Sequence, residues 1–169
     1  MEKMAMSKSL ANLLLLSFTL ILILSGCQTT ATNYLGAQVE RKGVVRLDSL
    51  QVDKQRWEDL YATVDYSFAR QDNQLHIDGT FFFSFSPTIN YTRVHDFELK
   101  LFLLDKDLLV VDYLDVATVL RGHLEVRVPF SYDLKLIDEV KAFTFGYYGW
   151  FYDEDGSGFR VWKLPKRQP

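Results

Sequence analysis

Alternating apolar and polar side chains are the main pattern of this chain. Over residues 60–70 the alternation has the two-residue period of a half-buried strand. Residues 71–73, Gln-Asp-Asn, predict a tight turn, and the alternation resumes over residues 75–85. We therefore expect these two segments to pair as an antiparallel hairpin. The side chains expected to point inward from the second strand are Leu75, Ile77, Gly79, Phe81, Phe83 and Phe85.

Similar patterns predict further strands along the rest of the chain. They cover residues 43–50, 96–103, 108–116, 124–130, 140–152 and 159–164. Pro129 has no N–H group to donate, which predicts that its strand lies at a sheet edge or ends in a bulge. Residues 53–59 are mostly polar and predict a helical turn or a loop, with Trp57 packed against the sheet edge.

About eight predicted strands, with turn signals between them and no long helical period, indicate an all-β fold. The prediction is an antiparallel β-sandwich of the immunoglobulin-like or fibronectin-like kind, and a small closed barrel is the alternative. Composition agrees, because aromatic residues form 15% of the chain and favour sheet over helix. The net charge of −3 at pH 7 provides no basic excess, so we expect no nucleic-acid partner.

The first residues of the chain have a different pattern, which is typical of a targeting segment. Lys3 and Lys8 precede an apolar run over residues 10–24, as in the basic and hydrophobic regions of a signal peptide. A helix over this run would be about 22 Å long, against roughly 30 Å for the hydrocarbon core of a bilayer. We therefore expect a cleaved signal helix, and an uncleaved signal anchor is the alternative.

The apolar run ends in Leu24-Ser25-Gly26-Cys27, which resembles the lipobox of bacterial lipoproteins. The resemblance covers residues 1–27 and implies cleavage between Gly26 and Cys27, lipidation of the Cys27 thiol, and anchoring in a lipid bilayer through the acyl chains. Cys27 is the single cysteine of the chain, so no intrachain disulfide can form. In similar Gram-negative lipoproteins an Asp after the cysteine favours the inner membrane. Gln28 therefore implies the outer membrane, facing the periplasm, as the location in the cell envelope.

These observations divide the chain into four parts. Residues 1–26 form the signal peptide, 27–33 a lipidated tether, 34–164 one β-sandwich domain and 165–169 a basic tail. The six residues after Cys27 reach roughly 20 Å when extended, which would keep the domain close to the bilayer. In outline, the predicted domain is similar to the small immunoglobulin-like domains of exported bacterial proteins.

The acidic turn after residue 152 is a candidate metal site. Asp153, Asp155 and Ser157, followed by Gly158, have the spacing of the first half of a calcium-binding loop. Leu164 stands where such a loop needs its bidentate glutamate. A solvated hairpin tip explains the same residues and is favoured over a calcium site.

The sequence gives little support for an enzyme active site. Three histidines have a carboxylate nearby in sequence, and the pairs are His76 with Asp78, His95 with Asp96, and His123 with Glu125. No spacing forces three such groups together, as a zinc site requires, so these are interpreted as surface histidines. The motifs of serine hydrolases, zinc proteases and phosphate-binding loops are not found. We therefore expect a protein that is not an enzyme and has no cofactor, and a hydrolase is the least favoured alternative.

The strand over residues 140–152 is the most aromatic segment. Tyr148, Trp150 and Tyr152 alternate with Tyr147 and Phe151 and so share one face. If exposed, they form a candidate surface for stacking on glycan rings or anchoring an envelope protein; if covered, they belong to the core. The sequence therefore predicts a membrane-anchored envelope lipoprotein with a non-enzymatic binding or structural domain. The alternative is a ligand-binding lipoprotein that uses calcium at the acidic turn or a glycan on the aromatic strand.

Overall fold

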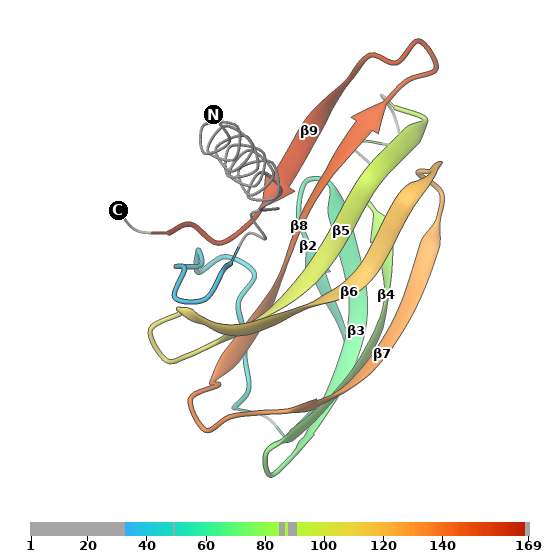
Figure 1. The fold of residues 1–169 in the computed structure, drawn as a ribbon. Helices are drawn as coiled ribbons and strands as arrows, with labels where there is room; N and C mark the ends of the chain where they lie inside the picture. Colours follow the sequence, from blue (N-terminus) through green and yellow to red (C-terminus); the bar gives the residue numbers. More distant parts are fainter. Residues whose placement is uncertain (1–32, 49, 85–86, 88–90, 168–169) are drawn as a thin grey trace, which may run out of the picture. The chain divides into compact units, whose positions relative to one another are not determined.

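A computed structural model describes residues 33–48, 50–84, 87 and 91–167 of the chain. The predicted signal helix, the tetrapeptide ending in Cys27 and nearly all of the predicted tether lie outside the described residues. Within them, the chain forms nine strands in two antiparallel sheets (Figure 1). The predicted all-β sandwich is thus confirmed. In the described part of the chain, no helix is long and apolar enough to cross a bilayer.

The smaller sheet contains the predicted hairpin and has the strand order β2-β3-β4-β7. Its strands are β2 (Gln51–Glu58), β3 (Ala62–Gln71), β4 (Gln74–Phe83) and β7 (Arg127–Lys135). The turn between β3 and β4 contains Asp72 at a φ of 55°, a left-handed conformation that Asp tolerates in tight turns. Pro129 pairs with Thr80 on β4, and β7 is an edge strand, as the missing N–H group predicts.

The larger sheet has the order β1-β8-β5-β6, with β9 also paired to β8. Its strands are β1 (Val45–Arg46), β5 (Arg93–Leu104), β6 (Val110–His123), β8 (Ala142–Tyr152) and β9 (Gly158–Lys163). β1 pairs with Ala142 and Phe143, whereas β9 pairs with β8 from Tyr147 onward. Residues 144–146 of β8 therefore have register partners on β5 only.

Three sequence predictions are corrected by the structure. Residues 53–58 belong to strand β2 instead of a helical turn or loop, and Asp59 lies in the turn that follows it. Trp57 is the one buried side chain of β2, so the strand's polar composition reflects an edge position with most side chains in solvent. The strand predicted over 43–50 shrinks to the two residues of β1, and the one predicted over 124–130 shifts to β7.

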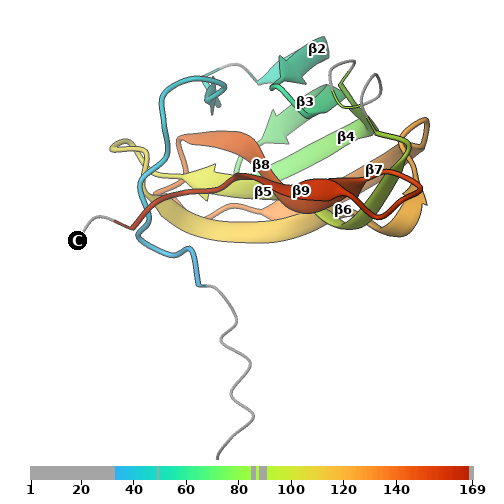
Figure 2. The same ribbon diagram turned by 90° about the horizontal axis from the view of Figure 1, so that it is seen from above.

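The two sheets form the two layers of the molecule (Figure 2). The main core cluster combines buried side chains of both sheets and is rich in aromatic rings. Phe81 of β4 stacks on Phe97 of β5, with ring centroids 5.1 Å apart. Tyr66 of β3 meets Phe143 of β8 edge-on at 5.7 Å. Such ring pairs add about 0.5–1.5 kcal/mol each to the gain from apolar burial, so the aromatic rows predicted from the alternation hold the layers together.

A second, smaller cluster lies on the opposite, outer face of the larger sheet. Tyr34 packs edge-on against Phe102 at 5.3 Å and against Tyr113 at 5.2 Å. Backbone hydrogen bonds hold its segment in place: Gly36 N–H donates to the Val110 carbonyl at 2.8 Å. Residues 34–44 therefore cover one end of this outer face, which we name the covered end. The other end carries the aromatic residues of β8 and is named the open end.

Candidate functional site

The open end carries a patch of exposed aromatic side chains. The patch consists of the exposed residues Tyr148 and Trp150 of β8 and Trp162 of β9, together with Tyr152 of β8, which is half-buried. Trp162 is 67% exposed, Trp150 40% and Tyr148 37%. The rings of Trp150 and Tyr152 lie 6.1 Å apart, and Trp162 is the register partner of Tyr148. The period of the strand places these residues on the outer face, and no segment among the described residues covers them as residues 34–44 cover Phe102.

A bulge in β5 shapes the surface beside this patch. Between the register pairs of His95 and Glu98, two residues of β5 face the single residue Gly149 of β8. The extra residue, Asp96, has a φ of 48°, and a Cβ on Gly149 would lie 2.5 Å from the ring of Phe97. Bulges of this kind redirect side chains and are common next to functional sites. Here a hollow of about 220 Å³ opens between the bulge and Trp150.

Polar groups surround the exposed rings. The Tyr148 hydroxyl donates to Glu98 Oε1 at 2.9 Å. Lys100, itself buried, donates from Nζ to Glu98 Oε2 at 2.8 Å and also bonds to Asp115. Burial and the bond to Glu98 raise the pKa of Tyr148, which keeps its hydroxyl protonated. Exposed rings beside fixed hydrogen-bonding groups suit a ligand with both apolar faces and hydroxyl groups, as sugars have.

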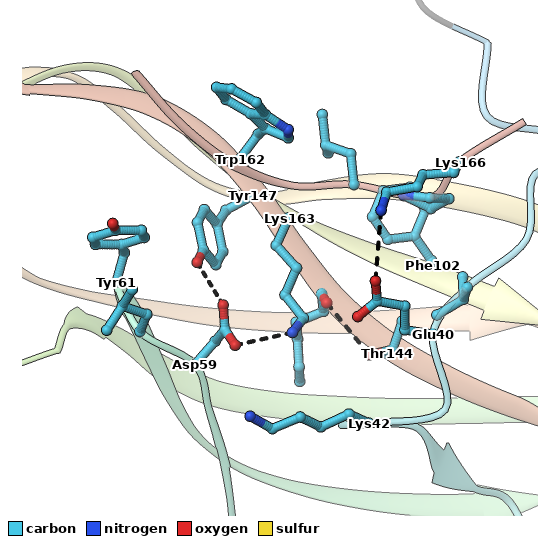
Figure 3. A pocket seen from close by; sticks show the side chains of 15 residues that line it. Glu40, Lys42, Asp59, Tyr61, Phe102, Thr144, Tyr147, Trp162, Lys163 and Lys166 are labelled. Carbon is cyan, nitrogen blue, oxygen red and sulfur yellow. Dashed lines mark hydrogen bonds and ion pairs between the residues drawn. The ribbon is translucent and has the colours of Figure 1, made fainter. Parts of the chain in front are cut away.

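A second concave site lies at the edge of the sandwich and was not predicted from the sequence. We name this cavity of about 390 Å³ the edge pocket (Figure 3). It opens between β1 and β9, on the edge of β8 where residues 144–146 have no register partner. Asp59 lies in it, between the Tyr147 hydroxyl at 2.6 Å and Lys163 Nζ at 2.9 Å. Tyr147 and Lys163 are register partners whose side chains both reach the Asp59 carboxylate.

The electrostatics of the edge pocket fix its protonation states. Burial by itself raises the pKa of Asp59, but the hydrogen bonds from Tyr147 and Lys163 outweigh it, so the pKa lies below its ordinary value. Burial and the bond to Asp59 raise the pKa of Tyr147 far above its usual range. At neutral pH Asp59 is therefore a carboxylate and Tyr147 a neutral phenol.

Backbone contacts hold the Asp59 turn in place. Asp59 N–H donates to the Ala62 carbonyl at 2.9 Å, and the Asp59 carbonyl accepts from Ser84 Oγ at 2.8 Å. On the opposite wall, Thr144 Oγ1 donates to the Gly43 carbonyl at 2.9 Å. Side chains of this pocket are therefore positioned by fixed backbone, as expected of a pre-formed ligand site.

One sign of the edge pocket was present in the sequence. In β9 the alternation that places Val161 in the core also places Lys163 on the inner side. A lysine in an inward row requires a buried partner of opposite charge. The partner, Asp59, lies 104 residues earlier, so its identity could not be read from local sequence.

The acidic turn is a hairpin tip between β8 and β9. Asp155 Oδ1 accepts the Ser157 N–H at 2.9 Å, which lowers the pKa of Asp155, and Asp153 N–H donates to the Ser157 carbonyl at 2.8 Å. Gly156 has the positive φ that such a turn requires, 81°. Across the described ranges, no three His, Cys, Asp or Glu side chains form a group that could hold a metal ion.

The histidines of the three predicted pairs lie on three different strands: His76 on β4 of the smaller sheet, and His95 and His123 on β5 and β6 of the larger sheet. His76, on β4, contacts Asp133 at 2.7 Å and Asp78 at 3.6 Å. His95, on β5, contacts Asp96 at 2.8 Å and borders the hollow beside Trp150. Only His95 therefore lies at a candidate site.

Comparisons with known proteins give no match: no family model, no curated protein and no solved structure corresponds to this chain. The aromatic patch with its hollow, the edge pocket and residues 24–27 are the features of this chain that bear on its function.

Proposed function

We propose that this protein is a lipoprotein of the bacterial cell envelope whose β-sandwich is a non-enzymatic binding domain. The observation that carries the proposal is the tetrapeptide Leu24-Ser25-Gly26-Cys27 at the end of a short apolar run, with the single cysteine of the chain in the lipidated position. A lipidated cysteine leaves no free thiol to form unwanted disulfides outside the cytoplasm. Gln28 favours the outer membrane, facing the periplasm, in a host that has one.

Mass spectrometry of the protein isolated from bacterial membranes tests the anchor. The mature amino-terminal peptide is expected to begin at Cys27 and to carry acyl chains. Cys27→Ser should stay unprocessed or leave the membrane fraction, whereas Gln28→Ala, which keeps the cysteine, should be lipidated like the parent. An unmodified Cys27 thiol in the mature protein would show that the anchor is not a lipid.

The aromatic patch supports a glycan as the ligand of the binding domain. Trp150 and Trp162 expose large ring surfaces that water does not solvate favourably. The nearby Glu98 carboxylate and Arg160, the outward register partner of Trp150, provide charged groups for sugar hydroxyls. A glycan chain of the envelope therefore fits this surface better than a nucleic acid, which the negative net charge disfavours.

Binding of the lipidated protein to insoluble envelope polysaccharides, measured by co-sedimentation, tests this ligand class. Trp150→Ala and Trp162→Ala are each expected to weaken binding by about fivefold or more, since one stacked ring contributes about 1–3 kcal/mol. Ile137→Ala removes an equally exposed apolar side chain elsewhere and should leave binding unchanged. Equal effects of all three variants would argue against a specific binding surface. Capture of an envelope protein that depends on Trp150 would show that the ligand is a protein and not a glycan.

Calcium is tested separately by thermal unfolding. A melting temperature that rises at millimolar calcium, and no longer does so in Asp153→Ala, would favour the calcium-binding alternative.

A further inference from the structure

We propose that the edge pocket binds a small molecule in which a carboxylate or phosphate head group is joined to an apolar or aromatic body. The pocket is separate from the exposed aromatic patch, apart from Trp162, which borders both. Its volume of about 390 Å³ lies within the range of small-ligand sites, roughly 300–1,000 Å³. The inference does not depend on the lipid anchor or on glycan binding.

The charges lining the pocket favour an anion. Three lysines and two carboxylates border it, and they are Lys42, Lys163, Lys166, Glu40 and Asp59. The net charge at the pocket is therefore positive, although the chain as a whole has a net charge of −3. A local concentration of positive charge in a concave site attracts anions more strongly than the same charges spread over a surface.

The three lysines differ in whether a carboxylate is already paired with their ammonium group. Asp59 already accepts one hydrogen bond from Lys163 Nζ, which leaves further donors on that ammonium. Lys166 lies 3.7 Å from Glu40 at the exposed rim. Lys42 extends toward the turn that carries Asp59 (Figure 3), and no carboxylate among the described residues pairs with it. Lys42 is therefore the main candidate to bind an anionic head group, with Lys163 as a second donor.

The remaining lining accounts for the apolar body. Phe102 and Phe145, both buried, form part of the wall where β8 has no partner on its outer edge. Leu60 and Trp162 border the opening and are 57% and 67% exposed. A ligand that contacts Leu60 and Trp162 would remove their apolar surface from water, which contributes about 25 cal/mol of binding free energy per Å².

A purely structural role for the Asp59 network makes a different prediction. Such a network would link the two sheets, and only Asp59, Tyr147 and Lys163 would matter for it. Lys42 would then be an ordinary exposed lysine whose replacement changes nothing. The Lys42 variant therefore distinguishes a ligand site from a structural ion pair.

Isothermal titration of the full lipidated protein in phosphatidylcholine nanodiscs tests the proposal with phenyl phosphate as the probe. Phenyl phosphate should bind about tenfold more tightly than inorganic phosphate, which lacks the ring, or benzyl alcohol, which lacks the charge. Lys42→Met should weaken phenyl phosphate binding by about tenfold, and Trp162→Ala should weaken it by a smaller factor. Lys135→Met removes an exposed lysine of β7 and should have no effect.

The source of the head group is decided by a second titration. The probe is dihexanoyl phosphatidic acid. If it binds more tightly than phenyl phosphate and with the same dependence on Lys42, the natural ligand is a lipid head group. If it binds more weakly, the natural ligand is a soluble anion. The proposal is overturned if none of these phosphates binds, or if binding is the same in Lys42→Met. Because the Lys42 side chain is exposed and takes no part in the core, the variant is expected to fold, which the unchanged far-UV spectrum would verify.

Discussion

The two ends of the outer face of the larger sheet are built from the same strands, yet one is buried and the other exposed. At the covered end, Phe102 of β5 is fully buried beneath Tyr34. At the open end, Trp150 and Tyr148 of β8 remain more than one-third exposed. All three side chains point outward from their strands. The comparison shows that an outward aromatic residue is buried or exposed depending on whether a segment from elsewhere in the chain covers it.

Between the two ends lies a polar boundary. Lys100 is buried and bonds to Glu98 at 2.8 Å and to Asp115. Its paired charges separate the apolar cluster from the aromatic patch, and Glu98 also accepts the Tyr148 hydroxyl. The covered end therefore contributes stability, and the open end keeps its rings available for a ligand.

The largest expected effect is at the covered end. Phe102→Ala should lower the free energy of unfolding by about 3–5 kcal/mol, because it leaves a cavity beneath Tyr34 and removes two ring contacts. Urea unfolding followed by far-UV circular dichroism measures the change. A loss below about 1 kcal/mol would mean that residues 34–44 do not cover this end in solution.

An intermediate effect is expected at the boundary. Lys100→Met should cost about 1–3 kcal/mol, because Glu98 and Asp115 lose their shared partner while both keep partial access to water. Burial by itself lowers the pKa of Lys100, but the bonds to Asp115 and Glu98 raise it above its usual value. The contribution of this lysine is therefore present below about pH 10.4 and is lost as the pH rises further.

Unfolding measured at pH 8 and pH 11 separates this charge effect from packing. The difference in unfolding free energy between the parent and Lys100→Met should be smaller at pH 11 than at pH 8. Lys135→Met, in an exposed position, should have the same unfolding free energy as the parent at both pH values. An unchanged difference would assign the effect to packing of the lysine stem.

The smallest expected effect on stability is at the open end. Trp150→Ala should change the free energy of unfolding by about 1 kcal/mol or less, because its ring is 40% exposed and no segment among the described residues covers it as Tyr34 covers Phe102. The same far-UV unfolding assay provides the comparison with Phe102→Ala. A loss as large as that of Phe102→Ala would show that Trp150 is a core residue and would remove the reason to regard the patch as a binding surface.

Much of the fold could be predicted from the sequence, and the two main failures have different physical causes. The hairpin of β3 and β4 and the pairing of β8 with β9 follow from two-residue alternation with a turn between the strands. β2 was missed because an edge strand with one buried side chain has no such alternation. The Asp59 site was missed because its parts come from the β2–β3 turn, β8 and β9, which only the packing of the two sheets brings together.

By itself, the sequence determined the all-β class, most strand positions and the faces to which their side chains point, because these depend on neighbours a few residues apart. It also supplied the one motif on which the proposed anchor depends. The tertiary structure decided which outward rings are covered and which charges meet in the edge pocket, because burial is set by segments distant in the chain. Tyr34 over Phe102 and Lys163 beside Asp59 are the two contacts in which that difference is clearest.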